Sequence, residues 1–167
     1  SHLRVGTVQY AATQSEELTQ KVVSAAGFAD AEEMLRTVTR RQFDLVAHWM
    51  RLGFVHGVMN TDNVALSGET IDYGPCAFTE RFDGTASFSS IDRQGRYAFG
   101  NQPNIIAWNM ARLAEALYPL LGAEKVDAYV KTVQPAWDEA WATWIGDDHD
   151  GLNAAADITT YNRCLLY

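Results

Sequence analysis

The residues of this sequence that could do chemistry gather in one short stretch near the middle of the chain. Asp62 and Asn63 are adjacent, and Asp72 follows a few residues later. Carboxylate and amide oxygens are ligands that Mg²⁺ accepts, and substrate phosphates often complete its coordination shell. The stretch therefore indicates a magnesium site that could also hold a nucleotide. The plainer interpretation is that all three residues form turns, as Asp and Asn often do.

The order of these residues follows the catalytic loop of protein kinases. That loop has a His-x-Asp sequence, an Asn five residues after the Asp, and later an Asp-Phe-Gly turn whose Asp binds the metal. Here His56 is present, Val58 stands where the Asp is expected, Asn63 follows at the right spacing, and Asp72 opens an Asp-Tyr-Gly turn. The metal-binding framework is kept, and the usual base is missing. Asp62 is the one acid left in the loop to replace it, and the histidine is expected to be a hydrogen-bonding scaffold.

Helices must position this stretch, and the sequence predicts them on its amino-terminal side. Ser15 and Asp30 are suited to cap helices, each being followed closely by acidic residues. The second of these helices has apolar residues at helical spacing and should end at Gly53. The segment 64–71 predicts a small β hairpin with a Ser-Gly turn, which would carry the metal ligands.

The last third of the sequence predicts helix again. Residues 101–103 (NQP) are a start signal, and the apolar stripe that follows ends at Gly122. A second stripe runs over 126–144, where Pro135 is expected to kink or restart the helix. The three tryptophans of this stripe are expected to pack into a core, because they recur at helical spacing.

Composition limits the class of protein. The 167 residues fit one domain or one lobe, with 47% hydrophobic and 20% charged residues, which is typical of a globular protein. The net charge of -8 argues against a nucleic acid or an anionic membrane as partner. Cys76 and Cys164 form no disulfide framework or zinc motif, and no apolar run reaches membrane length. The first residues also lack the apolar region of a signal peptide, so a cytoplasmic location is expected. The acidic segment 147–151 is predicted to be a solvated loop.

Several stretches closely resemble the selenoprotein O family, most densely over 53–121. They are residues 1–7 (SHLRVGT), 53–63 (GFVHGVMNTDN), 70–75 (TIDYGP), 92–97 (DRQGRY), 101–103 (NQP) and 108–109 (WN). The resemblance implies a protein-kinase-like fold that lacks the usual catalytic Asp, as in pseudokinases. It also implies a nucleotidyltransferase that binds ATP in a reversed orientation and transfers AMP to hydroxyl side chains of other proteins.

By the same resemblance, individual residues acquire expected roles. Asp62 matches the family's proposed base, and Asn63 and Asp72 match its Mg²⁺ ligands, with Asp72 also at the nucleotide. Arg4 matches an arginine that contacts the phosphates of ATP. The reversed orientation brings the α-phosphate to the metal, so an attacking hydroxyl displaces pyrophosphate.

The sequence also departs from a complete kinase-like site. It has no Gly-x-Gly-x-x-Gly loop, and its three lysines all lie in predicted helices. The predicted fold is therefore mainly α with a small β hairpin. Residues 1–167 are expected to form a single domain, the large lobe of a kinase-like fold. Its catalytic and metal-binding loop would span 53–75, and helix would follow over 101–145. The small lobe is expected to be missing, and the isolated fragment to be nearly inactive. Two alternatives stay open: a kinase-type phosphotransferase, and a non-catalytic pseudokinase scaffold.

Overall fold

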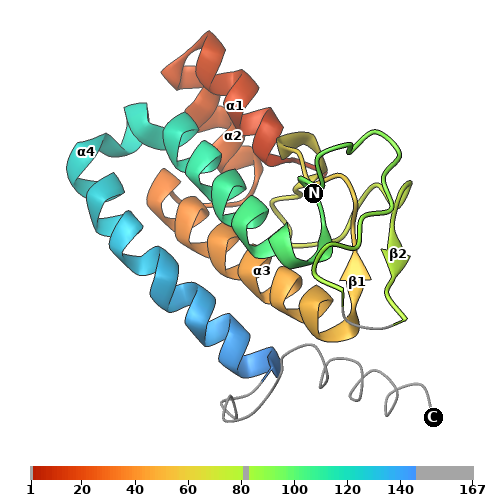
Figure 1. Cartoon of the computed structure of the whole chain (residues 1–167). Coiled ribbons are helices and arrows are strands. Elements are labelled where there is room, and N and C mark those ends of the chain that lie inside the picture. Colours follow the sequence, from red (N-terminus) through yellow and green to blue (C-terminus); the bar gives the residue numbers. More distant parts are fainter. Residues whose placement is uncertain (1, 81–82, 146–167) are drawn as a thin grey trace.

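The computed structural model describes residues 2–80 and 83–145, and the predictions for 147–151 and for Cys164 fall outside these residues. The described chain is mostly helical, with one small antiparallel sheet (Figure 1). None of its helices is both long and apolar enough to cross a lipid bilayer. In chain order the elements are α1 (Val5–Gln14), α2 (Glu16–Ala25), α3 (Ala31–Leu52), β1 (Phe54–Val55), η1 (Thr61–Asn63), β2 (Ala77–Phe78), η2 (Phe99–Asn101) and α4 (Gln102–Ile145).

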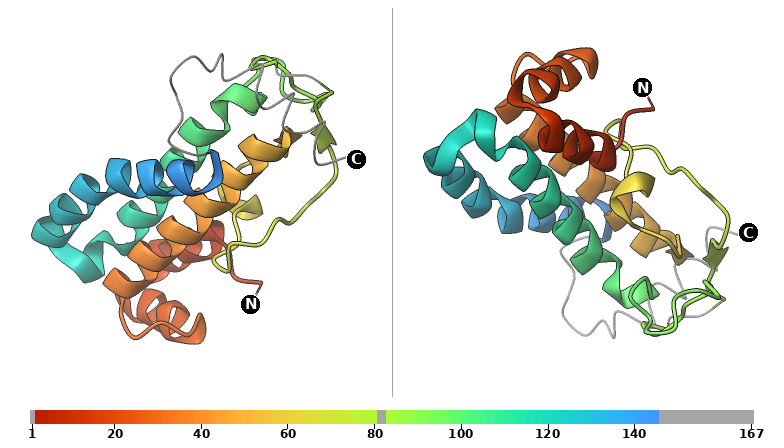
Figure 2. Two further views of the ribbon diagram at one scale, coloured as in Figure 1. Left: turned by 90° about the horizontal axis from the view of Figure 1, so that it is seen from below. Right: turned by 90° about the horizontal axis from the view of Figure 1, so that it is seen from above.

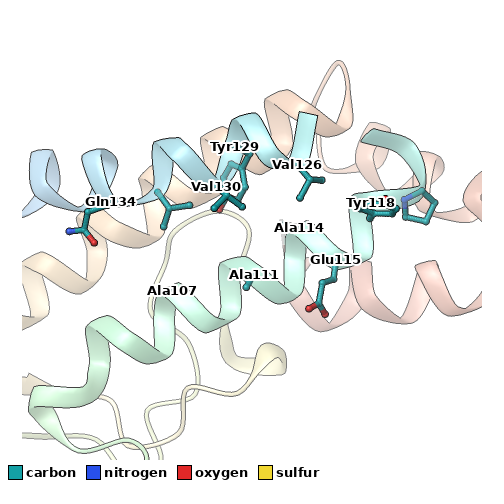
Figure 3. A pocket seen from close by; sticks show the side chains of 11 residues that line it. Ala107, Ala111, Ala114, Glu115, Tyr118, Val126, Tyr129, Val130 and Gln134 are labelled. Atoms are coloured by element: carbon teal, nitrogen blue, oxygen red, sulfur yellow. The ribbon is translucent and has the colours of Figure 1, made fainter. Parts of the chain in front are cut away.

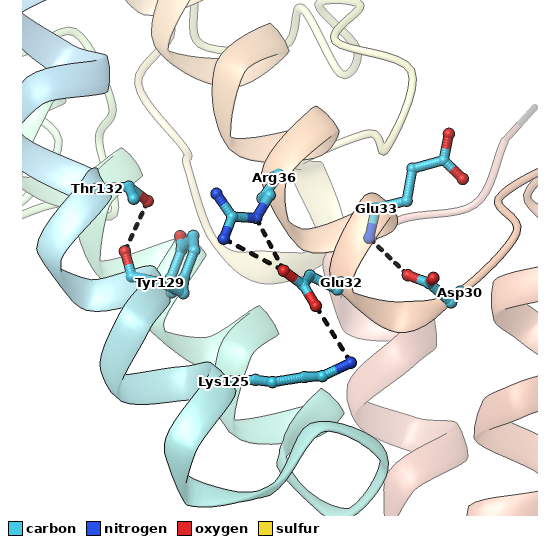
Figure 4. A network of polar contacts seen from close by, with 7 residues as sticks. All are labelled: Asp30, Glu32, Glu33, Arg36, Lys125, Tyr129 and Thr132. Atoms are coloured by element: carbon cyan, nitrogen blue, oxygen red, sulfur yellow. Dashed lines mark hydrogen bonds and ion pairs between the residues drawn. The ribbon is translucent and has the colours of Figure 1, made fainter.

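The predicted helix boundaries before the loop are confirmed. Ser15 Oγ accepts a hydrogen bond from the backbone N–H of Leu18 at 3.1 Å, which caps α2. Asp30 Oδ1 accepts one from the N–H of Glu33 at 2.8 Å, which caps α3 (Figure 4). Gly53 ends α3 with a φ of 70°, a left-handed conformation that glycine adopts without steric cost.

The helix α4 folds back on itself at Gly122, whose φ of 75° and ψ of 169° are not helical. We call residues 102–121 its first arm and residues 123–145 its second arm; the two run side by side in opposite directions (Figures 1 and 2). The end predicted at Gly122 is thus confirmed. Of the kink or restart predicted at Pro135, the restart does not occur, because the backbone stays helical there. Pro135 and Lys131, whose carbonyl loses its helical partner, are both exposed, so water can replace the missing bond.

The core lies between α3 and both arms of α4, with α1 and α2 packed at one end. The tryptophan prediction is confirmed, since Trp137 on the second arm packs edge-on against Phe43 of α3 with 5.5 Å between ring centroids. An ion pair also joins the second arm to α3, where Lys125 lies 3.1 Å from Glu32 (Figure 4). The largest fully buried apolar side chains are Phe43, Phe99, Met34, Leu35, Met59, Leu66, Ile106, Met110, Leu113 and Leu117.

The predicted hairpin over 64–71 is wrong. The two strands of the sheet are β1 and β2, which pair antiparallel across the whole loop region. Ala65 instead forms an antiparallel bridge with Arg4, and the N–H of Val5 donates to the carbonyl of Val64 at 3.0 Å. The amino-terminal segment therefore occupies the backbone groups that a hairpin partner would need. The segment 70–74 has no regular structure and turns towards the loop that precedes it.

Candidate functional site

Two buried side-chain amides of the first arm form hydrogen bonds to the backbone of β1 and of the loop that follows it. Gln102 Oε1 accepts from the backbone N–H of His56 at 3.0 Å, and its Nε2 donates to the carbonyl of Phe54 at 2.9 Å. Asn109 Nδ2 donates to the carbonyl of Met59 at 2.9 Å. Both amides are fully buried. Because each loop contact satisfies a backbone group that is shielded from water, the first arm fixes the path of this loop.

His56 is a scaffold, as the sequence indicates. Its side chain is fully buried, with Nε2 at 2.7 Å from the carbonyl oxygen of Ile71. Its Nδ1 accepts from the backbone N–H of Val58 at 3.3 Å, so the neutral ring carries its proton on Nε2 and donates it to Ile71. Burial lowers the pKa of His56, and its hydrogen bonds and the nearby charge of Asp72 oppose this effect only in part. The ring thus ties the loop to the residue that precedes Asp72.

Asn63 and Asp72 are brought together, as predicted. Asn63 Nδ2 donates to Asp72 Oδ2 at 2.9 Å and to the carbonyl of Val58 at 3.1 Å. Among the described residues, the amide oxygen of Asn63 and the other carboxylate oxygen of Asp72 have no hydrogen-bond partner. Asp72 has a φ of 59°, a left-handed conformation that costs most non-glycine residues free energy, that Asp adopts more readily than most, and that clusters at functional sites.

This pair suits Mg²⁺ better than a metal that needs a complete protein cage. No group of three His, Cys, Asp or Glu side chains that could hold a metal occurs in residues 2–80 and 83–145. One amide oxygen and one carboxylate oxygen are, however, the kind of donor set that Mg²⁺ uses when waters and substrate phosphates supply the remaining ligands. The residues present therefore fit the predicted ion.

Asp62 lies beside this pair in sequence but is held differently. It sits in η1 with an exposed side chain. Within the described part of the chain, no hydrogen bond or ion pair engages its carboxylate. The carboxylate packs against the first turn of α1, where a methyl group on Gly6 would lie only 2.1 Å from Asp62 Oδ1. The side chain is thus available to a proton donor from solvent or substrate.

Arg4 is the residue immediately before α1, and its side chain is exposed. Its backbone bridge to Ala65 places it next to the segment that follows Asn63. Gln42 on α3 supports the same segment, because its Nε2 donates to the carbonyl of Ala65 at 2.6 Å. The structure therefore joins the chain start, the loop and α3 at one point.

Sequence reasoning missed the residues that support the site. Gln102 and Asn109 fall inside the quoted motifs NQP and WN, but a polar residue in a helix gives no sign by itself that it is buried. Gln42 and Gly6 were also missed. The burial of Gln102 and Asn109 had one signal in the sequence. Both lie on the apolar side of a predicted helix, close to Ile105 and Ile106.

An apolar groove elsewhere in the molecule is not this site. It has a volume of about 670 Å³ and lies between the two arms of α4 (Figure 3). Its walls include Ala111, Ala114, Tyr118, Val126 and Val130, and it shares no residue with the loop. The charged residue in its lining is Glu115, so the groove offers no positive charge to a triphosphate.

Comparison with known proteins agrees with the resemblance. The family model described as "Protein adenylyltransferase SelO" matches residues 1–156. The protein nucleotidyltransferase YdiU of Cereibacter sphaeroides is 51% identical over 158 aligned residues, which cover 84% of this chain and 33% of that relative. YdiU of Alcanivorax borkumensis is 48% identical, with 96% of this chain and 38% of the relative covered. YdiU of Mycolicibacterium paratuberculosis is 49% identical, with 86% and 33% covered.

The chain spans about a third of the length of the curated relatives that it matches. The family match nevertheless covers nearly the whole of the sequence, including all the predicted site residues. The chain belongs to the protein adenylyltransferase SelO family.

Proposed function

We propose that this chain supplies the metal-binding and proton-accepting residues for transfer of AMP from ATP to hydroxyl side chains of proteins. The observation that carries the proposal is the contact between Asn63 and Asp72, which leaves one oxygen of each side chain without a hydrogen-bond partner among the described residues. Family membership supports the same activity. The proposal includes a cytoplasmic location, which would expose the site to ATP and to intracellular protein substrates.

Each residue has a role in the proposed reaction. The free oxygens of Asn63 and Asp72 would hold Mg²⁺, which would neutralise phosphate charge. Arg4 would contact the phosphates, and Asp62 would accept the proton of the attacking hydroxyl. The hydroxyl oxygen forms a bond to the α-phosphorus, the bond between the α- and β-phosphates breaks, and pyrophosphate leaves. The work of the site is to orient the reactants and balance their charge.

We also propose that the described residues form the large lobe of a protein-kinase-like fold. The helical core with a loop that carries a His, an Asn and an Asp-Tyr-Gly turn supports this assignment. The sequence contains no Gly-rich loop and no lysine in a described strand, and both normally grip the nucleotide in such folds. The 167-residue chain alone is therefore expected to transfer little AMP.

A radiolabel experiment tests the proposal. A family-length chimera, in which this chain replaces the matching third of the Cereibacter sphaeroides relative, is incubated with Mg²⁺, an acceptor protein and ATP labelled at the α- or the γ-phosphate. We expect the α-label alone to enter protein. Asp72→Ala and Asn63→Ala should each reduce transfer by about 100-fold or more, as loss of transition-state charge stabilisation does. Asp127→Ala, an exposed carboxylate on the second arm, should leave the rate unchanged.

The other outcomes point to the alternatives. Entry of the γ-label would indicate a phosphotransferase of the kinase type. Nucleotide binding that Asp72→Ala leaves unchanged, with no transfer of either label, would indicate a non-catalytic scaffold. Strong AMP transfer by the 167-residue chain alone would contradict the proposed dependence on a second lobe.

A further inference from the structure

Gly6 is a glycine whose presence the backbone does not explain. It occupies the second position of α1, and its φ is not in the left-handed range, unlike that of Gly57 and Gly68. Any L-residue could adopt this conformation, and glycine lowers helix stability compared with alanine. The reason for glycine must therefore lie in the space around it.

That space is filled by Asp62. A Cβ atom on Gly6 would lie 2.1 Å from Oδ1, 3.2 Å from Cγ and 3.5 Å from the backbone nitrogen of Asp62. The first of these distances is far below van der Waals contact, so a side chain on Gly6 and the present position of the carboxylate exclude each other. The carboxylate also lies at the amino end of a helix, where the partial positive charge of the backbone favours an anion.

The start of α1 cannot move away to relieve such a clash. The N–H of Val5 donates to the carbonyl of Val64 at 3.0 Å, and the N–H of Leu66 donates to the carbonyl of Leu3 at 2.9 Å. Val5 is also fully buried in the core. Because the helix start and the loop are joined on both sides of the Arg4–Ala65 bridge, the side chain of Asp62 is the part that would have to shift.

We propose that Gly6 is a positioning residue for the carboxylate of Asp62. This inference rests on the proposed function, in which that carboxylate accepts the proton of the attacking hydroxyl. No hydrogen bond holds the carboxylate among the described residues, so packing against the bare backbone of Gly6 sets its place. A methyl group at this position drives the carboxylate away from α1 and out of line with the acceptor hydroxyl, while Asn63 and Asp72 keep their contact.

A thermal unfolding cycle on the 167-residue chain tests the contact without any activity. The four proteins are the unchanged chain, Gly6→Ala, Asp62→Ala and the double variant. In the Asp62→Ala background, Gly6→Ala should raise the midpoint by about 1–3 °C, as alanine does in a helix. With Asp62 present, the gain should be smaller or absent, because the carboxylate must first move aside. Gly84→Ala, whose added methyl group meets no atom within 4 Å, should behave alike in both backgrounds. Equal effects of Gly6→Ala in the two backgrounds would overturn the contact.

A kinetic cycle on the family-length chimera tests the positioning role. Gly6→Ala should lower kcat for AMP transfer by about 10- to 100-fold, the scale expected for a misplaced catalytic group, and change KM for ATP by no more than about twofold. In the Asp62→Ala background it should lower kcat no further. A Gly6→Ala variant with full kcat would overturn the positioning role. A chimera that transfers no AMP would remove the proposed function and the positioning role with it, while the unfolding cycle would still report the contact.

Discussion

The two arms of α4 pack against the same core but contribute differently to the molecule. The first arm donates the amides of Gln102 and Asn109 to backbone groups of the loop. The second arm reaches α3 instead, through the hydrogen bond between Tyr129 and Thr39 and through the ring of Trp137 on Phe43. These polar contacts of the first arm thus reach the loop that leads to Asn63, and those of the second arm reach α3.

The first arm therefore positions the loop, whereas the second arm supports the core. The first arm combines a buried apolar face with two polar contacts that determine where the loop runs. The second arm is more exposed, and the groove between the arms leaves part of its apolar face uncovered by described residues (Figure 3). Substitutions in the first arm should therefore affect both stability and the site, whereas those in the second arm should affect stability alone.

The largest difference between the arms should appear in their apolar side chains. Leu117→Ala in the first arm removes a fully buried side chain and should lower the free energy of unfolding by about 2–5 kcal/mol. Val130→Ala in the second arm, where the side chain is 60% exposed, should change it by less than about 0.5 kcal/mol. Urea unfolding followed by circular dichroism measures both. Similar losses in the two variants would contradict the comparison.

A smaller loss is expected when a polar contact of the first arm is removed. Gln102→Leu leaves the N–H of His56 and the carbonyl of Phe54 unpaired in a buried place, and should cost about 2–4 kcal/mol in total. It should also shift the NMR signals of residues 54–59. The matched substitution in the second arm is Gln134→Leu, an exposed residue bonded within its own helix to Asp138. If both variants unfold at the same urea concentration, the first arm has no special role.

Tyr129→Phe tests the polar contact of the second arm. It removes the bond of 2.8 Å to Thr39, whose hydroxyl also has the carbonyl of Leu35 as a partner at 2.7 Å. Because Thr39 keeps that partner, we expect a loss of only about 1 kcal/mol. The NMR signals of Asn63 and Asp72 should not move. Shifted signals for these two residues would show that the second arm also reaches the site.

The pH dependence of stability should report on two histidines, one in the loop that the first arm contacts and one that the second arm covers. Burial lowers the pKa of His56, in the loop, and of His48, which stacks on Trp144 of the second arm at 4.2 Å; Arg51 lowers the latter further. A lowered pKa means that the unfolded chain binds the proton more readily. The stability contribution is therefore complete above the unfolded pKa of about 6.5 and is lost as pH falls through the folded value.

Urea midpoints between pH 7.5 and 5 measure this effect. We expect the midpoint to fall with pH in the unchanged chain, and His56→Gln and His48→Gln each to remove part of the slope. A midpoint that does not depend on pH in this range would contradict the lowered pKa of both rings.

Local signals in the sequence were enough for the helices but not for the site's surroundings. α3 begins after Asp30 and ends before Gly53, as predicted. Both signals are local, because a capping side chain and a left-handed glycine affect only the residues beside them. The convergence of Asn63 and Asp72 was also predicted, through their order along the chain. The hairpin failed because the true backbone partner of Ala65 is Arg4, far upstream, and hydrophobic periodicity carries no information on such pairing.

The close approach of Gly6 to Asp62 could not be predicted for a related reason. It depends on the register of that same bridge, which fixes how the helix start lies on the loop. The buried amides of Gln102 and Asn109 were missed because burial of a polar residue is decided by tertiary packing rather than by its neighbours in sequence.

The bridge between Arg4 and Ala65 has a consequence for how the protein folds. It joins segments about sixty residues apart, and the chain between them includes three helices. Closing such a long loop costs conformational entropy that local contacts do not repay, so this junction should form late, after α1 has docked on α2 and α4. A nascent chain would then form its helices before the loop that carries Asn63 and Asp72 reaches its final place.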